Sequence, residues 1–168
     1  MTKKAAAKKQ ASTGTPATAA LAAAGVPFTL HPYTHDPAAE SYGMEAAEVL
    51  GVDPARVFKT LMVDVEGRLA VGIVPVSGTL DLKAIAAALG SKKASMADPK
   101  AAERRTGYVL GGISPLGQRQ SSPTVLDESA LTHSTILVSG GRRGLDIELA
   151  PEDLLRLSKA QIAPIAGA

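Results

Sequence analysis

One lysine stands out among the residues that could do chemistry, because it lies on an apolar strand face. Residues 57–65 are short, rich in β-branched and large apolar side chains, and bounded by turn residues, which predicts a β-strand. Side chains alternate across a strand, so Lys59 shares its face with apolar residues alone. These are Val57, Leu61, Val63 and Val65. An unpaired buried ammonium is costly. Lys59 therefore either reaches water near the strand end or lies in a cleft with a partner or a lowered pKa, and the pattern alone leaves both open.

Other polar residues could cooperate with this lysine. Asp146 follows Leu145 on a predicted strand, and an inward carboxylate there would be a reasonable partner for Lys59. The Gly111-Gly112 pair and the stretch 139–141 are rich in backbone donors, and they are either ordinary turns or a cradle for an anion or an ester oxygen. Both lack the P-loop and dinucleotide fingerprints. Arg142 could bind phosphate or could lie solvated at a hairpin tip.

Several classes of site are excluded or disfavoured. The chain contains no cysteine, which excludes disulfides, thiolate metal sites and a thiol nucleophile of its own. His31 and His35 have a spacing that suits a metal on a helix, but Pro32 and the strand pattern prevent that geometry. No serine lies in a G-x-S-x-G elbow. We expect no metal and no cofactor.

Length and composition predict one domain and a tail. A chain of 168 residues with 45% hydrophobic content can form one sizeable core. Residues 1–14 are basic and low in complexity, so they are predicted to be a disordered tail, either without function or a weak electrostatic arm for a polyanion. Residues 15–168 form the predicted domain. No apolar run reaches membrane-spanning length and no signal peptide is evident, so a cytoplasmic protein is expected.

Helices and strands are mixed along the chain. Helices are predicted at residues 15–25, 41–51, 81–90 and 98–107 and from 151 onward, from cap residues, proline starts and glycine stops. Strands are predicted at residues 28–33, 57–65, 68–75, 92–96, 124–127, 135–138 and 145–149, with turns at 66–67 and 139–144 and a glycine-rich loop at 107–115. Short turns between neighbouring strands predict an α+β fold with a largely antiparallel or mixed sheet.

Five stretches together resemble a known family. They are Tyr33-Thr34-His35-Asp36-Pro37, Val57-Phe58-Lys59-Thr60-Leu61, Asp81-Leu82-Lys83, the stretch 106–117 that contains GGISPLG, and the stretch 138–147 that contains SGGRRGLDI. In order and spacing they are similar to the YbaK/EbsC proteins, which are bacterial Cys-tRNA(Pro) deacylases related to the editing domain of prolyl-tRNA synthetase. The resemblance runs from about residue 15 to about residue 160 and does not include the basic tail.

The resemblance implies a fold, a reaction and a site. The fold would be a compact α+β single domain around a mixed, barrel-like β-sheet flanked by helices. The reaction would be hydrolysis of the ester that joins cysteine to the 3′-terminal adenosine of mischarged tRNA. Together with the residues discussed above, it leads us to assign catalytic roles to Lys59, Gly112 and Asp146. Substrate-binding roles are assigned to Tyr33, Thr60, Gly111, Ser139 and Arg142.

The implied chemistry agrees with the composition. In proteins of this kind the thiol of the substrate attacks its own carbonyl, which releases the amino acid as a thiolactone. Lys59 would orient the ester and stabilise developing charge, and the Gly112 region would supply backbone donors. Two alternatives stay open: a deacylase for another mischarged tRNA such as Ala-tRNA(Pro), and a non-catalytic module that binds tRNA or a synthetase. Aminoacyl-tRNA and prolyl-tRNA synthetase are the expected partners.

Overall fold

The structure is a computed structural model that describes residues 14–39 and 41–167. The predicted basic tail lies outside these residues except for Gly14. The helices are α2 (Pro16–Ala24), α3 (Tyr42–Leu50), α4 (Leu82–Ala88), α5 (Pro99–Thr106) and α6 (Pro151–Ser158), with 3₁₀ turns η1 (Pro54–Arg56) and η2 (Glu128–Thr132). Within the described ranges, no helix combines the length and the apolar character needed to span a bilayer.

The predicted helix signals form caps in the structure. The Thr15 hydroxyl accepts a hydrogen bond from the backbone N–H of Thr18, and Pro16 occupies the first turn of α2. Ser41 and Asp98 cap α3 and α5 in the same way. These caps satisfy backbone donors that the first helical turn leaves without partners, and they set where α3 and α5 begin.

The described strands form three sheets. A five-stranded mixed sheet has the order β5 (Ala94–Met96), β2 (Phe58–Val65), β3 (Arg68–Pro75), β6 (Thr124–Asp127) and β9 (Gln161–Ala163). A three-stranded antiparallel sheet has the order β1 (Thr29–Pro32), β8 (Leu145–Leu149) and β7 (Ile136–Arg142). A two-stranded sheet pairs β10 (Ala166–Gly167) with β4 (Thr79–Leu80).

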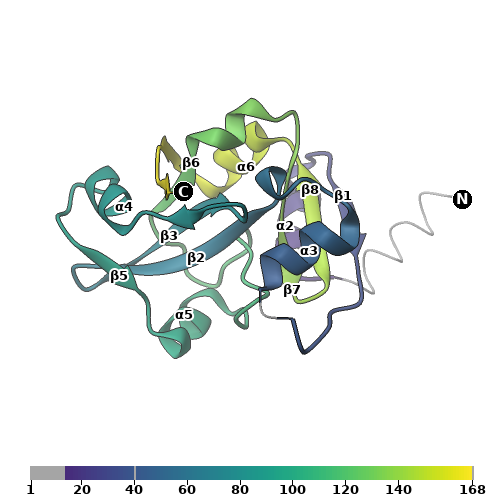
Figure 1. The fold of residues 1–168 in the computed structure, drawn as a ribbon, viewed down its shortest axis with the longest axis horizontal. Helices are drawn as coiled ribbons and strands as arrows, with labels where there is room; N and C mark the ends of the chain where they lie inside the picture. The colour runs from purple at the N-terminus through teal and green to yellow at the C-terminus, as the bar shows by residue number, and fades with distance from the viewer. Residues whose placement is uncertain (1–13, 40, 168) are drawn as a thin grey trace, which may run out of the picture.

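The α+β class and the mixed pairing are confirmed, but the strands do not form one closed barrel. The larger sheet mixes antiparallel pairs with the parallel pairs β3–β6 and β6–β9. It meets the three-stranded sheet at a single parallel bridge between Val57 and Leu137. Figure 1 shows the three-stranded sheet with α2 and α3 on one side of the molecule, the five-stranded sheet on the other, and α5 below β2.

The outer edge of β2 is unpaired in its middle. Its inner edge pairs with β3 along its whole length, whereas its outer edge pairs with β5 only at residues 63–65 and with β7 only at Val57. The Val76 N–H donates to the Val57 carbonyl, and hydrogen-bonding direction alternates along an antiparallel ladder. The backbone groups of Thr60 therefore point away from β3, toward the gap between β5 and β7.

The two faces of β2 belong to different parts of the core. Phe58 and Met62 pack in a cluster with Tyr108 and Ile113, and both are buried. Val63 packs on the other face with the fully buried Ile85 of α4. Burial of such side chains stabilises the fold by roughly 1.5–3 kcal/mol each and holds β2 rigidly on both faces.

One predicted turn is wrong. The sequence predicts a turn at residues 139–144, but residues 139–142 extend β7, and only Arg143 and Gly144 separate it from β8. A register irregularity between Ser139 and Arg142 accommodates this extension. The short strands β4, β9 and β10 and the turn η2 have no recognisable pattern in the sequence and are not among the predicted elements.

Candidate active site

A pocket of about 470 Å³ opens at the unpaired edge of β2. It is lined by residues 58–62 of β2, 41–43 at the start of α3, 96–97 beside β5, Pro99 and Ala102 of α5, the loop residues Leu110, Gly111 and Ile113, and by Tyr33, Val57, Ser139 and Asp146. Its size suits a small organic group. Its position follows from the fold, because backbone that no strand covers is accessible there.

Lys59 lies in this pocket. It occupies the apolar face that the alternation predicted, with Val57, Val63 and Val65 buried on the same side. Burial lowers the pKa of the Lys59 ammonium below its usual value. Within the described residues it makes no ion pair, so the predicted pairing with Asp146 is not present. The structure thus favours the cleft interpretation of Lys59.

Asp146 and Tyr33 form the acidic side of the pocket. Asp146 lies on β8, opposite both His31 and Ser139, and is only 6% exposed. Burial raises the pKa of Asp146 from 3.8 to about 7. Burial, with added contributions from the charges of Asp146 and Glu45, raises the pKa of Tyr33 to about 12. Asp146 can therefore change protonation state near neutral pH, while the Tyr33 phenol keeps its proton.

The threonine after Lys59 offers an uncommitted polar atom. Thr60 Oγ1 is buried and has no hydrogen-bond partner among the described residues. A buried hydroxyl without a partner costs free energy, which a bound polar group would recover. Thr60 is among the residues that line the pocket, so its hydroxyl is a candidate partner for a polar group of a bound substrate.

The glycine loop lines the pocket through Gly111, whereas Gly112, the predicted backbone donor, lies outside the lining. Gly111 lines the pocket, with φ 83°, and a Cβ there would lie 2.8 Å from the Tyr42 ring. Gly112 is not among the lining residues, and its N–H donates to the Val109 carbonyl. A Cβ on Gly112 would lie 2.8 Å from the Cα of Arg142. Gly112 thus lets the loop approach the β7–β8 hairpin closely, and its N–H is already engaged.

The arginines of the hairpin act at the rim. Arg142 is exposed and outside the lining, and its side chain donates to the Arg143 carbonyl. Arg143 donates from Nε to the Leu110 carbonyl at 2.8 Å, and its guanidinium lies 5.0 Å from the Tyr42 ring centroid. Glu103 accepts from the N–H of Leu110 at 3.0 Å. These contacts fix the loop over the mouth of the pocket.

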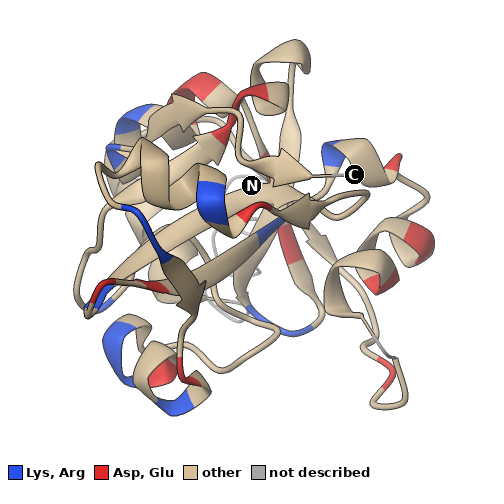
Figure 2. Cartoon of the chain, turned by 60° about the vertical axis from the view of Figure 1, so that its left-hand side comes forward, with Lys and Arg blue, Asp and Glu red and all other residues tan. Residues whose placement is uncertain are grey.

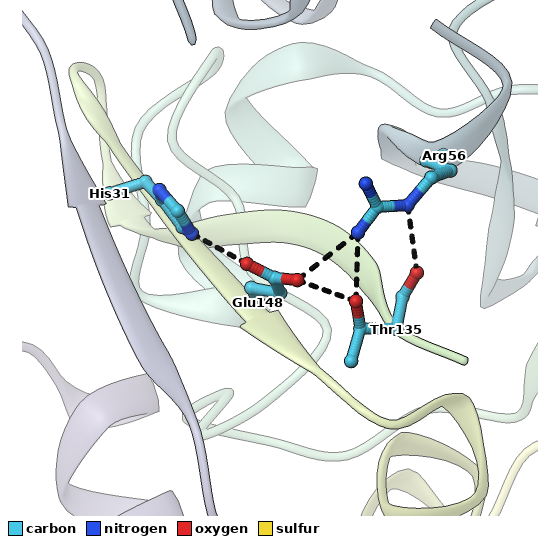
Figure 3. Close-up of polar contacts among 4 residues, drawn as sticks. All are labelled: His31, Arg56, Thr135 and Glu148. Atoms are coloured by element: carbon cyan, nitrogen blue, oxygen red, sulfur yellow. Dashed lines mark hydrogen bonds and ion pairs between the residues drawn. The ribbon is translucent and has the colours of Figure 1, made fainter. Parts of the chain in front are cut away.

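A polar network fixes the strands that carry Lys59 and Asp146 (Figure 3). Glu148 accepts from Arg56 at 3.1 Å and from the Thr135 hydroxyl at 2.5 Å, and its other oxygen lies 2.8 Å from His31 Nε2. Arg56 is three residues before Lys59, and Glu148 is two residues after Asp146. These bonds lower the pKa of Glu148, first through Thr135 and then through His31 and Arg56, while burial acts in the opposite direction. The network thereby ties the start of β2 to β8.

The histidines of the predicted pair are engaged separately. His31 contacts Glu148, and His35 Nδ1 lies 2.7 Å from the buried carboxylate of Glu45. No group of three or more possible metal ligands occurs within residues 14–39 and 41–167.

Sequence reasoning missed the apolar part of the site. Tyr42, Met96 and Leu110 line the pocket and are partly exposed, although large apolar side chains usually lie inside. They come from three segments distant in sequence, so no local pattern marks them. Of the predicted residues, the structure brings together Tyr33, Lys59, Thr60, Gly111, Ser139 and Asp146, and it leaves Gly112 and Arg142 outside the lining.

Comparisons with known proteins agree on one family. The family of aminoacyl-tRNA editing domains matches residues 36–157. EbsC of Enterococcus faecalis, a candidate Cys-tRNA(Pro)/Cys-tRNA(Cys) deacylase, is 46% identical over 120 residues, which are 71% of this chain and 73% of EbsC. Among solved structures, a candidate trans-editing enzyme for prolyl tRNA synthetase superposes with a TM-score of 0.78 at 24% identity, over 91% of this chain and 96% of that one. A hypothetical protein superposes with a TM-score of 0.81 at 24% identity, over 91% and 100% of the two chains. The two solved structures bear on the fold.

Proposed function

This chain belongs to the family of aminoacyl-tRNA editing domains, and we propose from this premise that it is a trans-editing hydrolase that deacylates mischarged Cys-tRNA(Pro). The observation that carries the proposal is the pocket at the unpaired edge of β2, which is lined by the half-buried Lys59 and by the buried carboxyl of Asp146. The relative EbsC, named as a candidate for this activity, shares nearly half of the aligned residues.

The proposed reaction uses a nucleophile supplied by the substrate. The cysteine thiolate of the substrate attacks its own ester carbonyl, a carbon–sulfur bond forms, and the bond to the ribose oxygen breaks. The ribose oxygen leaves as a hydroxyl by taking up the proton that the thiol gave to Asp146, and water then opens the cyclic thioester to release cysteine. The chain has no cysteine of its own, so a thiol in this reaction has to come from the substrate.

The residues of the pocket have distinct roles in this reaction. The Lys59 ammonium orients the ester and stabilises the oxyanion that develops on the carbonyl oxygen. Asp146, with its pKa near 7, accepts the proton of the thiol when ionised. Tyr33 and Thr60 supply hydroxyl groups that position the substrate, and the apolar walls exclude water from the reacting atoms.

The domain assignment and the partners follow from the same proposal. Residues 15–168 form the deacylase domain, and the substrate is the 3′ acceptor end of aminoacyl-tRNA. Prolyl-tRNA synthetase is the proposed protein partner, because it produces the mischarged tRNA, and the cytoplasm is the proposed location because translation occurs there.

Single-turnover release of amino acid tests the proposal, with enzyme in excess over tRNA(Pro) charged with cysteine, serine or alanine. A serine hydroxyl is nearly the size of a thiol, so the pocket can reject it only weakly by fit, but it is far less ionised than a thiol of pKa ~8.5. We expect fast release of cysteine and much slower release of serine and alanine. Equal rates for serine and cysteine would exclude attack by the substrate thiol and would favour water positioned by Asp146. Preferred release of alanine would assign a different tRNA substrate, and binding without release would show a non-catalytic module.

A further inference from the structure

Positive charge is concentrated in one segment beside the pocket. Residues 91–120 contain only two acidic residues, Asp98 and Glu103. Their basic residues are Lys92, Lys93, Lys100, Arg104, Arg105 and Arg119. Over the rest of the described chain, acidic residues outnumber basic ones. The modest net charge of +2 therefore conceals a basic segment, and Figure 2 shows Lys and Arg in blue on α5.

α5 forms one wall of the pocket and carries its charges on the outer face of the helix, turned away from that wall. Pro99 and Ala102 of α5 line the pocket, while Lys100 and Arg104 are exposed on the helix surface. Four residues separate Lys100 from Arg104, so both lie on one face, about 6 Å apart along the axis. Lys92 and Lys93, also exposed, directly precede β5, whose Met96 lines the pocket.

These four cations are not neutralised by neighbouring acids. None of them makes an ion pair with another described residue. The carboxylate of Asp98 accepts from the Ala101 N–H, and that of Glu103 accepts from the Leu110 N–H. Both acids of the segment are thus committed to backbone donors.

Apolar side chains border the opening of the pocket. Met96 is 52% exposed and Leu110 is 38% exposed, and Tyr42 lies beside them on the pocket wall. An aromatic ring and flexible apolar side chains offer contact area to the flat faces of unpaired bases. Cations next to exposed apolar groups match the composition of a nucleic-acid strand, whose phosphates and bases alternate along the chain.

We propose that the acceptor end of a tRNA lies across α5 and β5, with its phosphates along Lys92, Lys93, Lys100 and Arg104 and its unpaired terminal bases against the apolar rim. This inference rests on the proposed function for the identity of the RNA. An ester at the 3′ end can reach Lys59 only if the preceding nucleotides cross the rim of the pocket. Among the described residues, these four cations without an ion pair lie on the side of the pocket formed by α5 and β5.

Binding of uncharged tRNA(Pro) tests the surface without requiring catalysis. The variant Lys100→Gln/Arg104→Gln keeps good helix formers on α5 and removes two charges. Each phosphate contact contributes about 0.7 to 0.9 to the slope of log K against log salt concentration. We therefore expect the slope to fall by about 1.4 to 1.8 and the affinity in ~0.1 M salt to fall about 25-fold to 60-fold. The control Lys83→Gln/Lys159→Gln removes the same charge from exposed positions on α4 and after α6, and its affinity and slope should equal those of the parent.

Hydrolysis of a short substrate separates this proposal from the proposed function. Release of cysteine from an adenosine ester, which lacks the stem, should proceed equally in the parent and in the α5 variant. If the parent deacylates and the α5 variant binds tRNA with unchanged affinity and salt slope, the proposed tRNA-binding surface is refuted and the proposed function is not affected. If the parent releases no amino acid but the α5 variant binds tRNA with lower affinity and a lower salt slope, the proposed function is contradicted and the proposed surface is supported. Loss of synthetase binding with unchanged tRNA binding would show a protein interface instead and would also overturn it.

Discussion

Replacement of Asp146 by asparagine should remove a fall in stability that the parent shows between pH 5 and pH 8. The Asp146 carboxyl is 6% exposed, and burial raises its pKa from 3.8 to about 7. Between these values the folded state holds a proton that the unfolded state has lost. Stability therefore falls as pH rises through this window, because unfolding releases the proton. The amide that replaces the carboxyl has no such proton to release, so the variant lacks this dependence.

The magnitude follows from the two pKa values. Each unit of pKa difference corresponds to about 1.36 kcal/mol of unfolding free energy. Nearly all of the fall between pH 5 and pH 8 occurs below about pH 7, the pKa of Asp146 in the folded state. From pH 5 to pH 8 the parent should lose about 2.5 kcal/mol of unfolding free energy relative to Asp146→Asn. For a domain of this size that difference is about 5–10 °C in melting temperature.

Urea unfolding of the parent and the variant at pH 5 and pH 8 measures this difference directly. The control is Asp81→Asn, which makes the same substitution at an exposed N-cap where asparagine caps equally well. The stability difference between variant and parent must change more with pH for Asp146→Asn than for Asp81→Asn. A stability difference between parent and Asp146→Asn that is the same at both pH values would refute the assignment of a raised pKa to Asp146.

Three further predictions concern the lysine, the loop and the polar network. Lys59→Ala should lower the rate of single-turnover deacylation by about two powers of ten or more, while the protein stays folded. Lys83→Ala is the control, and a near-normal rate in folded Lys59→Ala would contradict the role of Lys59. Gly112→Ala places a Cβ 2.8 Å from the Arg142 backbone, so it should cost about 1–3 kcal/mol of stability and lower activity, and an unchanged melting temperature would show that the loop can shift freely. Glu148→Gln should cost about 1 kcal/mol at pH 7, measured by urea unfolding. Because the pKa of Glu148 is lowered in the folded state, this difference should vanish as pH falls through that pKa, and a difference that persists in acid would exclude a charge effect.

Local sequence signals determined the helix starts, the turn after β2 and the apolar environment of Lys59. Caps such as Thr15 and Asp98, and the turn at residues 66–67, act through bonds and dihedral preferences within a few residues, so they can be predicted without the fold. The alternation that puts Lys59 on an apolar face is equally local. The family resemblance named the remaining site residues, and the structure places most of them around one pocket.

Tertiary structure alone decided what those residues can do. Lys59 and Asp146 line one pocket without pairing, because a single bridge at Val57 joins two sheets and leaves the edge of β2 open. The engaged N–H of Gly112 also depends on the path of the loop against the distant β7–β8 hairpin. Such contacts join residues far apart in sequence, and their geometry depends on the packing of whole elements, which no local pattern encodes.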